Sequence, residues 1–305
     1  MFGPDNPYYA RVRLLVRVLP QIAREPVFAL KGGTAINLFV RDMPRLSVDI
    51  DLVYLPLEPR DEALANIQVA MDRIGERIAQ SLPDARVDKL KTRSGMDCKI
   101  LVHQAGEEIV IETSPVMRGV VNSPSEREVS KPVEEVFGYT RINVSSLEDL
   151  YAGKLCAALD RQHPRDLFDV KVLYEHEGLT RSLHEIFLIY LLCGNRPVSE
   201  MLQPKFQELR SVFEAQFVGM SLIETRLEEL EAVREKLVGD IHARFTDAQK
   251  QFLLSFKQGE PDWELLNRPG VEKLPAIQWK LHNIRSMSGQ KHKAALAKLE
   301  KVLYG

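Results

Sequence analysis

The chain has 305 residues, of which 45% are hydrophobic and 28% are charged, with 17 glycines and 17 prolines. This composition excludes a wholly disordered protein, because disordered chains combine few hydrophobic residues with a high net charge. The formal net charge of −2 gives no global attraction to nucleic acid or membrane, so any such affinity must come from a local patch. A length of about twice a typical domain predicts two domains.

The cysteines and the apolar runs indicate the cellular compartment of the protein. Cys98, Cys156 and Cys193 are odd in number and far apart, so we expect neither a disulfide framework nor a cysteine metal site. The amino-terminal stretch MFGPDNPYYARVRLL lacks the continuous apolar region of a signal peptide. The run IFLIYLLCG at 186–194 is shorter than the roughly 18–20 residues that cross a bilayer. We therefore expect a cytoplasmic protein without a membrane segment.

The first half of the chain mixes two hydrophobic periods. Apolar residues recur at helical spacing in some segments and alternate with polar residues, or run continuously, in others. The predicted helices cover 8–24 and about 60–80, and a short one follows the glycines of KGGTAINLF. The predicted strands cover 27–30, 46–55, 98–103, 108–114 and 141–146, the third and fourth forming a hairpin through QAGE.

The second half shows almost only helical periodicity. It opens with Ser146 as a candidate N-cap and Asp149 three residues later, which is the spacing of a capping box. We therefore expect an α+β fold in two parts. Residues 1–145 would form a mixed sheet with flanking helices, and residues 146–305 an α-helical domain.

Two aspartates lie two positions apart in the strand predicted at 46–55. Side chains at such positions point to the same face of a strand, about 6.6–6.8 Å apart. Asp49 and Asp51 would therefore repel each other unless a cation lies between them, and carboxylate oxygens suit Mg²⁺. Taken alone, such a pair more often marks an edge strand whose polar side faces water.

A glycine pair stands where the first predicted strand passes into a helix. Gly32, Gly33 and Thr34 form a turn whose backbone N–H groups would point at a ligand, and the helix dipole favours an anion such as phosphate there. Glycine suits a position that something must approach closely. Thr34 can add a hydroxyl group and cap the helix. Taken alone, a plain tight turn explains the same residues.

The two features constrain each other. If the strands at 27–30 and 46–55 are neighbours, a phosphate chain on the glycine turn lies beside the acidic pair. Nucleotidyl transfer requires that arrangement: backbone amides hold the phosphates, metal ions bridge phosphate to protein, and an acceptor hydroxyl attacks in line. Glu112 has strand parity opposite to that of the two isoleucines before it, so we expect it to face the same side and complete a set of three carboxylates.

Five segments carry a family resemblance: KGGTAINLF, RLSVDIDLV, VIETSP, KLCAALDRQHPRDLFDV and the closing PAIQWKL. In this order they resemble the AbiEii/AbiGii-type nucleotidyltransferase toxins of the DNA polymerase β-like nucleotidyltransferase superfamily. The resemblance covers residues 25–175 well and the tail more loosely. Fourteen residues separate Thr34 from Asp49, slightly more than is usual in the superfamily, so we expect an extended loop at 40–47.

The resemblance implies a nucleotidyltransferase-like sheet domain and assigns roles in it. Gly33 and Thr34 would contact the phosphates of an NTP. Asp49 and Asp51 would hold Mg²⁺.

The resemblance also assigns roles to residues of the helical half. Lys154 matches the helical lysine of the family, and its compact ammonium group suits a triphosphate; alone it would be an ordinary solvated lysine. Asp166 and Asp169 match the segment RD-x-x-D. Asp166 fits a site role and a structural ion pair with Arg165 equally well, whereas Asp169 fits a supporting role on the same helical face.

The stretch 278–305 is locally basic. It carries Lys280, Arg285, Lys291, Lys293, Lys298 and Lys301 against Glu300 alone, a net charge of +5. Contact with an RNA backbone and a solvated helix face explain this charge equally well.

Three functions follow as hypotheses. The first is a Mg²⁺-dependent nucleotidyltransferase that moves a nucleoside monophosphate from an NTP to an acceptor and releases pyrophosphate. For it, the resemblance implies a toxin of a toxin–antitoxin or phage-defence (abortive infection) system, an RNA acceptor such as the 3′ end of tRNA, and an antitoxin partner. The second is a haloacid-dehalogenase-like phosphatase with Asp49 as covalent nucleophile, which leaves the glycine turn unexplained. The third is a non-catalytic nucleotide-binding module.

Overall fold

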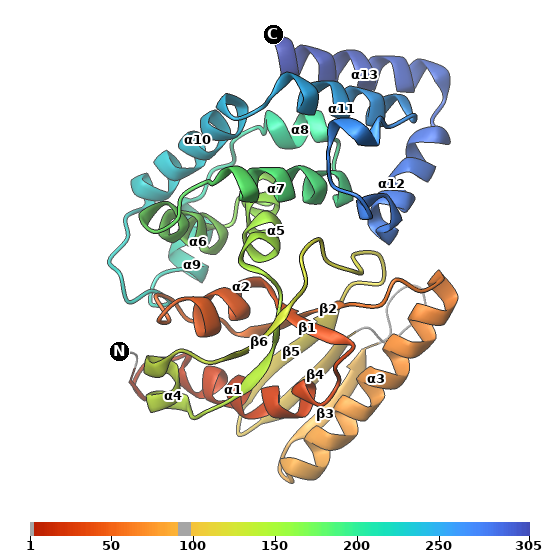
Figure 1. Cartoon of the computed structure of the whole chain (residues 1–305). Helices are drawn as coiled ribbons and strands as arrows, with labels where there is room; N and C mark the ends of the chain where they lie inside the picture. Colours follow the sequence, from red (N-terminus) through yellow and green to blue (C-terminus); the bar gives the residue numbers. More distant parts are fainter. Residues whose placement is uncertain (1–2, 91–98) are drawn as a thin grey trace. The chain divides into compact units, whose positions relative to one another are not determined.

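The computed structural model describes residues 3–90 and 99–305, and Figure 1 traces the chain. The chain forms two compact units. The first comprises Met1–Leu150 together with Ala215–Thr225, and the second comprises Tyr151–Glu214 together with Arg226–Gly305.

The first unit is built around a seven-stranded mixed sheet with the strand order β3-β4-β5-β2-β1-β7-β6. Its elements in chain order are α1 (Tyr9–Ala23), β1 (Phe28–Lys31), α2 (Gly32–Ala35), η1 (Ile36–Val40), β2 (Asp49–Tyr54), α3 (Arg60–Ser81), β3 (Arg86–Leu90), β4 (Lys99–Gln104), β5 (Glu107–Thr113), β6 (Ser125–Glu128), α4 (Lys131–Phe137) and β7 (Arg141–Val144). Strand β1 pairs with β2 in the antiparallel sense, and β2 pairs with β5 in the parallel sense. The two strands that carry the glycine turn and the acidic pair are therefore neighbours, as predicted.

One face of the sheet is apolar and covered. It carries Ile50, Leu52, Ile100, Val102, Ile109 and Ile111, none of them more than 1% exposed. Helix α3 packs here, since a Cβ on its Gly75 would lie 3.5 Å from Val87 Cγ1 and 3.8 Å from Ile100 Cδ1. Helix α1 contacts α3, β5 and β7. Because successive strand residues point to opposite faces, the other face carries Asp49, Asp51 and Glu112.

Most predicted elements of the sheet are present, and three elements were missed. The hairpin of β4 and β5 forms as predicted, although the predicted start of its first strand at Cys98 lies outside the described residues. Strands β3 and β6 lie at the two edges of the sheet. Their sequences, RVDKL and SERE, lack an apolar face, and neither these strands nor α4 were predicted from the sequence.

The second unit is helical throughout the part of the chain that the structure describes. From the end of the first unit onward the elements are α5 (Leu147–Asp160), α6 (Pro164–Glu175), α7 (Arg181–Cys193), α8 (Val198–Leu202), α9 (Arg210–Gln216), α10 (Leu227–Ala243), α11 (Asp247–Gln258), η2 (Trp263–Leu265), η3 (Val271–Lys273), α12 (Pro275–Arg285) and α13 (Gly289–Tyr304). The N-cap of α5 is confirmed, because Asp149 N donates to Ser146 Oγ at 3.1 Å. None of the described helices is long and apolar enough to cross a membrane.

A segment late in the chain returns to the first unit. Residues 215–225 lie along the loop that precedes β2. Leu46 N donates to Met220 O at 2.7 Å, and Leu222 N donates to Pro44 O at 2.9 Å. The loop expected before β2 is therefore held in place by backbone hydrogen bonds to a segment about 175 residues later in the chain.

Candidate nucleotide site

Three acidic side chains share the polar face of the sheet. The parallel pairing of β2 and β5 aligns Asp49 with Val110 and Asp51 with Glu112. Adjacent strands lie about 4.7–4.9 Å apart, so Asp51 and Glu112 are neighbours on one face. This register agrees with the side that strand parity predicted for Glu112. All three carboxylate residues are partly exposed.

The glycine turn lies against this acidic face. Gly32 has a φ of +72°, in the left-handed region that only glycine adopts readily. A Cβ built on Gly32 would overlap Asp51 Oδ2 and would lie 3.1 Å from Asp51 Cγ. Asp51 thus packs directly on the α-carbon of Gly32, and any side chain at that position would push the carboxylate away.

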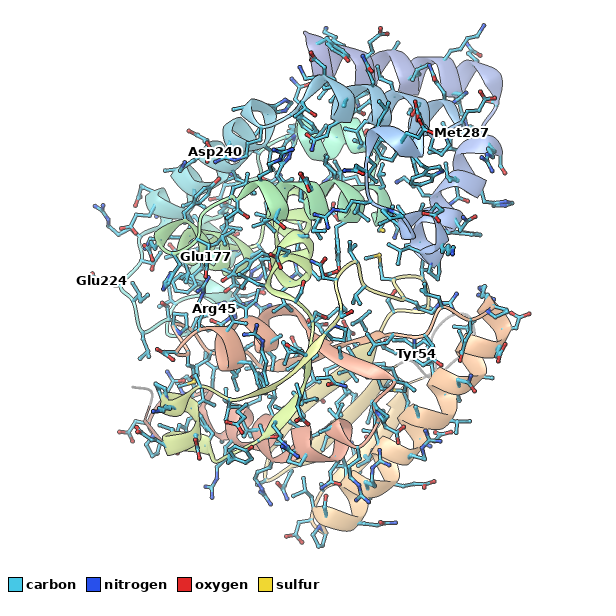
Figure 2. All side chains as sticks on the ribbon, in the orientation of Figure 1. Arg45, Tyr54, Glu177, Glu224, Asp240 and Met287 are labelled. Carbon is cyan, nitrogen blue, oxygen red and sulfur yellow. The ribbon has the colours of Figure 1, made fainter. Side chains whose placement is uncertain are left out.

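Gly33 makes room for two other polar side chains. A Cβ on Gly33 would lie 2.7 Å from Arg45 Nη2 and 3.0 Å from Ser47 Oγ. Arg45, labelled in Figure 2, is only 2% exposed, and its Nη1 donates to the carbonyl of Leu46 at 2.8 Å. In this structure the space beside both glycines is filled by the protein's own side chains. The phosphate contact predicted for the turn therefore rests on its backbone N–H groups.

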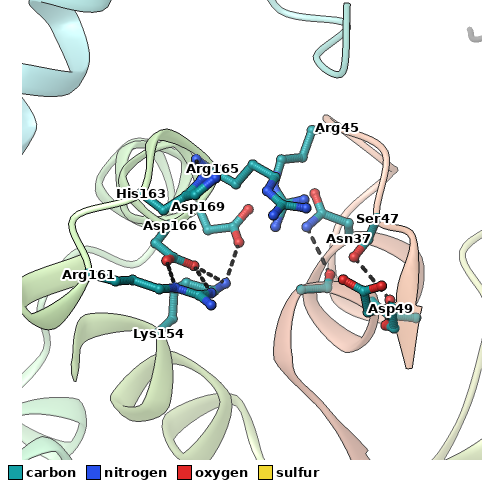
Figure 3. A network of polar contacts seen from close by, with 12 residues as sticks. Asn37, Arg45, Ser47, Asp49, Lys154, Arg161, His163, Arg165, Asp166 and Asp169 are labelled. Atoms are coloured by element: carbon teal, nitrogen blue, oxygen red, sulfur yellow. Dashed lines mark hydrogen bonds and ion pairs between the residues drawn. The ribbon is translucent and has the colours of Figure 1, made fainter. Parts of the chain in front are cut away.

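Thr34 connects the turn to the start of β2. Its hydroxyl group is fully buried, donates to the carbonyl of Asp49 at 2.5 Å and lies 3.0 Å from Ser47 Oγ. The prediction that Thr34 caps the helix is wrong, because the N-cap of α2 is Lys31 and no side chain caps it. The hydroxyl group instead fixes the glycine turn to the strand of the acidic pair. Figure 3 shows this region, where Asn37 Nδ2 also donates to Gly33 O at 2.9 Å.

Glu112 is paired with a lysine of the neighbouring strand. Lys99 Nζ lies 3.0 Å from Glu112 Oε2, and the two residues are register partners across the β4–β5 hairpin. Within residues 3–90 and 99–305, no group of three or more His, Cys, Asp or Glu side chains is arranged to hold a metal ion. The three carboxylates share a face but do not form a ready-made metal site, so the triad stays a prediction.

The predicted residues of the helical half form a buried ionic cluster within the second unit. Lys154 Nζ on α5 lies 2.8 Å from Asp166 Oδ1 and 3.0 Å from Asp169 Oδ2, both on α6. Arg161 donates from Nε to Asp166 Oδ2 at 2.6 Å (Figure 3). Lys154 is 6% exposed, and the side chains of the two aspartates are 1% exposed. The cluster joins α5 to α6.

The charges of this cluster stabilise one another. Burial alone would raise the pKa of Asp166, but the nearby Lys154 and Arg161 outweigh it and hold that pKa well below its usual range. Lys154, Asp166 and Asp169 are buried, whereas the Arg161 side chain is 63% exposed. Asp166 therefore belongs to an ion-pair network, in which it contacts Lys154 and Arg161.

Several basic residues of the carboxyl-terminal stretch have structural partners. Lys280 donates to Gly194 O at 2.5 Å at the end of α7, and burial lowers its pKa to about 8. Lys298 pairs with Glu200 at 2.9 Å. Arg285 Nε donates at 2.9 Å to a backbone carbonyl that follows α11. Part of the positive charge of this stretch is thus engaged in hydrogen bonds and an ion pair within the second unit.

A comparison with protein families decides the identity of the chain. The family model described as nucleotidyl transferase AbiEii toxin, type IV toxin–antitoxin system, matches residues 13–283. The chain belongs to the AbiEii family. It is accordingly a nucleotidyltransferase, and the family match favours this hypothesis over the phosphatase. No curated protein matches the sequence.

A solved structure supports the fold of this AbiEii-family protein. MenT4, a nucleotidyltransferase toxin from Mycobacterium tuberculosis H37Rv, is similar with a TM-score of 0.62 and 14% identity over 97% of this chain and 95% of that chain. JHP933 from Helicobacter pylori is more distant, with a TM-score of 0.45 and 18% identity over 80% of this chain and 94% of that chain. At this identity the MenT4 likeness supports the fold alone.

Sequence reasoning missed three polar residues around the glycine turn of this AbiEii-family chain. Arg45, Ser47 and Asn37 all contact the turn, yet none belongs to a pattern that names a site. Arg45 and Ser47 lie in RLSVDIDLV, immediately before the acidic pair. Their closeness to that pair in the sequence was the one signal that could have marked them as site residues. Lys99 was also missed, because only the strand register places it beside Glu112.

Proposed function

We propose that this AbiEii-family chain transfers a nucleoside monophosphate from an NTP to an RNA acceptor, such as the 3′ end of tRNA, and releases pyrophosphate. The observation that carries the proposal is the packing of Asp51 against Gly32, beside Glu112 in strand register. It supports a site in which phosphates and carboxylates meet, since the backbone N–H groups of the turn and the carboxylates of β2 and β5 lie on adjoining strands.

The donor set of the acidic face fits a divalent cation. Asp49 and Asp51 offer hard oxygen ligands from one face of β2, and Glu112 is the nearest further carboxylate in the register. Mg²⁺, when bound there, would neutralise phosphate charge during transfer. The chain's own part would be to orient: the Thr34 hydroxyl fixes the turn to β2, and Arg45 holds the loop before β2 against Gly33.

For Lys154 and Asp166 the buried cluster supports a structural role in joining α5 to α6. The nucleotide-binding role implied by the family resemblance stays a prediction. Lys154→Arg keeps the charge and Lys154→Met removes it. If both variants fold and only Lys154→Met loses NTP binding in calorimetry, the binding role is supported; equal binding by both would contradict it.

The biological setting follows from the family. We propose that the chain acts as the toxin of a type IV toxin–antitoxin pair in abortive infection, opposed by a cognate antitoxin. Growth arrest on expression, relieved by coexpression of the antitoxin gene and absent with the Asp51→Ala variant, would support it.

The direct test uses labelled substrates. The protein is incubated with Mg²⁺, total cellular RNA and each of the four NTPs labelled at the α-phosphate. We expect label to enter a discrete RNA band with one preferred NTP, and to be lost with Asp49→Ala or Asp51→Ala. Label that stays in free nucleotide under all conditions, or enters RNA equally with both variants, would contradict the proposal.

A further inference from the structure

Four charged side chains form a row across the middle of the sheet. The registers align Lys31 of β1 with Asp51 of β2, Asp51 with Glu112 of β5, and Glu112 with Lys99 of β4. Residues opposite each other in neighbouring strands point to the same face. The row therefore reads positive, negative, negative, positive over four adjacent strands, with the two carboxylates in the centre.

Lys99, the lysine at the β4 end of the row, forms an ion pair with Glu112. Lys99 Nζ lies 3.0 Å from Glu112 Oε2, and the two side chains are 38% and 46% exposed. An ion pair with that much solvent contact contributes only about 0.2–1 kcal/mol, so it breaks at little cost. Glu112 is thus held by a weak, accessible partner rather than by a buried network such as that of Lys154.

The carboxylates of the acidic face are not gathered into a metal site. Asp51 and Glu112 are strand neighbours, yet the described part of the chain contains no three ligand side chains gathered to hold a metal ion. While Lys99 Nζ lies 3.0 Å from Glu112 Oε2, that oxygen is paired with the ammonium group and is not available to a cation beside the aspartates.

We infer that Lys99 competes with the divalent cation for the Glu112 carboxylate, so that Glu112 joins the acidic pair only when Lys99 has left it. The inference rests on the proposed function, in which Asp49, Asp51 and Glu112 face the cation. No covalent step is involved: one ion pair is exchanged for another. The released ammonium group then lies on the same face as the glycine turn, where the phosphates of the NTP would meet it.

The experiment measures cation affinity without NTP, with Mn²⁺ as the probe. Free Mn²⁺ is titrated by electron paramagnetic resonance against the wild type, Lys99→Met, Glu112→Gln and the double variant. Lys89→Met is the matched control, because Lys89 is a lysine of the neighbouring strand β3 that pairs with Asp72 instead of Glu112. Thermal melts confirm that each variant is folded.

We expect Lys99→Met to bind Mn²⁺ up to about fivefold more tightly than the wild type, which corresponds to the loss of a weak ion pair. Glu112→Gln should bind it more weakly, and Lys89→Met should bind as the wild type does. In the Glu112→Gln background, Lys99→Met should have a smaller effect, since the competition has been removed.

Two outcomes separate this inference from the proposed function. If Glu112→Gln weakens Mn²⁺ binding but Lys99→Met leaves it unchanged, the competition is wrong and the metal assignment stands. If Glu112→Gln has no effect on Mn²⁺ binding, Glu112 is not a ligand, and both the inference and the third carboxylate of the proposed site are wrong.

Discussion

At the scale of single residues, Gly32 and Gly33 are required because polar side chains pack directly against their α-carbons. A Cβ on Gly32 would overlap the Asp51 carboxylate, and a Cβ on Gly33 would lie 2.7 Å from Arg45 Nη2 and 3.0 Å from Ser47 Oγ. Glycine at these two positions therefore lets polar side chains reach the backbone of the turn. The glycine pair in the sequence predicted a close approach to the backbone by a phosphate, whereas the structure shows that side chains also approach it.

Gly32→Ala tests this close approach, with Gly106→Ala as a matched control. Both glycines have a positive φ, +72° and +84°, but a Cβ on Gly106 meets nothing within 4 Å. The control should lose about 1–2 kcal/mol of unfolding free energy from left-handed strain alone. Gly32→Ala should lose more and should also lose nucleotidyl transfer, because Asp51 must move. Denaturant unfolding and pyrophosphate release measure the two effects; equal behaviour of the variants would contradict the account.

His184 gives the second unit a pH-dependent stability. Burial lowers its pKa to about 4 from an ordinary value of 6.5; a backbone hydrogen bond at Ile241 opposes the shift and the Arg244 charge adds to it. The unfolded chain therefore binds more protons than the folded one between these pH values. The unfolding free energy should fall as the pH drops from about 6.5 to about 4, by up to about 3 kcal/mol, and should be independent of this group above that window.

The His184→Phe variant checks this prediction by chemical denaturation at several pH values. It keeps an aromatic ring beside Phe245, whose ring centroid lies 5.2 Å from that of His184. The variant should lose part of the acid sensitivity between pH 6.5 and 4 while unfolding normally at pH 7. An unchanged pH profile would show that His184 is not the responsible group.

At the scale of elements, a buried carboxylate fastens α3 to the turn after α1. Glu25 is 4% exposed and accepts from Arg73 Nη2 at 2.6 Å and from Arg77 Nη2 at 2.7 Å. The Arg73 hydrogen bond is the largest influence on the pKa of Glu25, and together with Arg77 it outweighs burial and lowers that pKa. These contacts hold α3 in place over the apolar face of the sheet.

Glu25→Gln should lower the unfolding free energy by about 2–3 kcal/mol, because it leaves two arginines without their shared anion. The loss is below the roughly 3–5 kcal/mol of a fully buried pair, since the Arg73 side chain is 49% exposed. Glu62→Gln, at an exposed position of α3, is the control and should change stability little. Urea denaturation of the two variants measures the difference; a loss no larger than that of the control would refute the structural role of Glu25.

The elements were predictable where a strong local pattern fixed them. Strand β2 and the β4–β5 hairpin follow from apolar alternation and a glycine loop, and α5 from its Ser146 cap. The edge strands β3 and β6 were not predictable, because strands that pair on one side need no apolar period. The Lys99–Glu112 pair depends on register between strands, which no local pattern encodes.

At the scale of the whole molecule, one segment from late in the chain belongs to the first compact unit. Residues 215–225 begin at the end of α9, after α5, α6, α7 and α8, yet they belong to the first unit, where they hold the loop that carries Arg45. Long-range pairing of this kind leaves no periodic signal, so the division expected after residue 145 could not include it. The role of Lys280 in the basic carboxyl-terminal stretch was likewise not predictable. The local charge of the stretch does not reveal that Lys280 donates a hydrogen bond to the carbonyl of Gly194 at the end of α7.

The central claim is that the acidic face of the sheet in this AbiEii-family protein performs nucleotidyl transfer. Pyrophosphate release is the most direct measurement, made with the preferred NTP, Mg²⁺ and cellular RNA for the wild type, Asp51→Asn and the control Asp88→Asn, a partly exposed carboxylate of β3 outside the row. The account predicts that Asp51→Asn loses at least about 100-fold in rate while Asp88→Asn keeps the wild-type rate. A folded Asp51→Asn variant that releases pyrophosphate as fast as the wild type would contradict it.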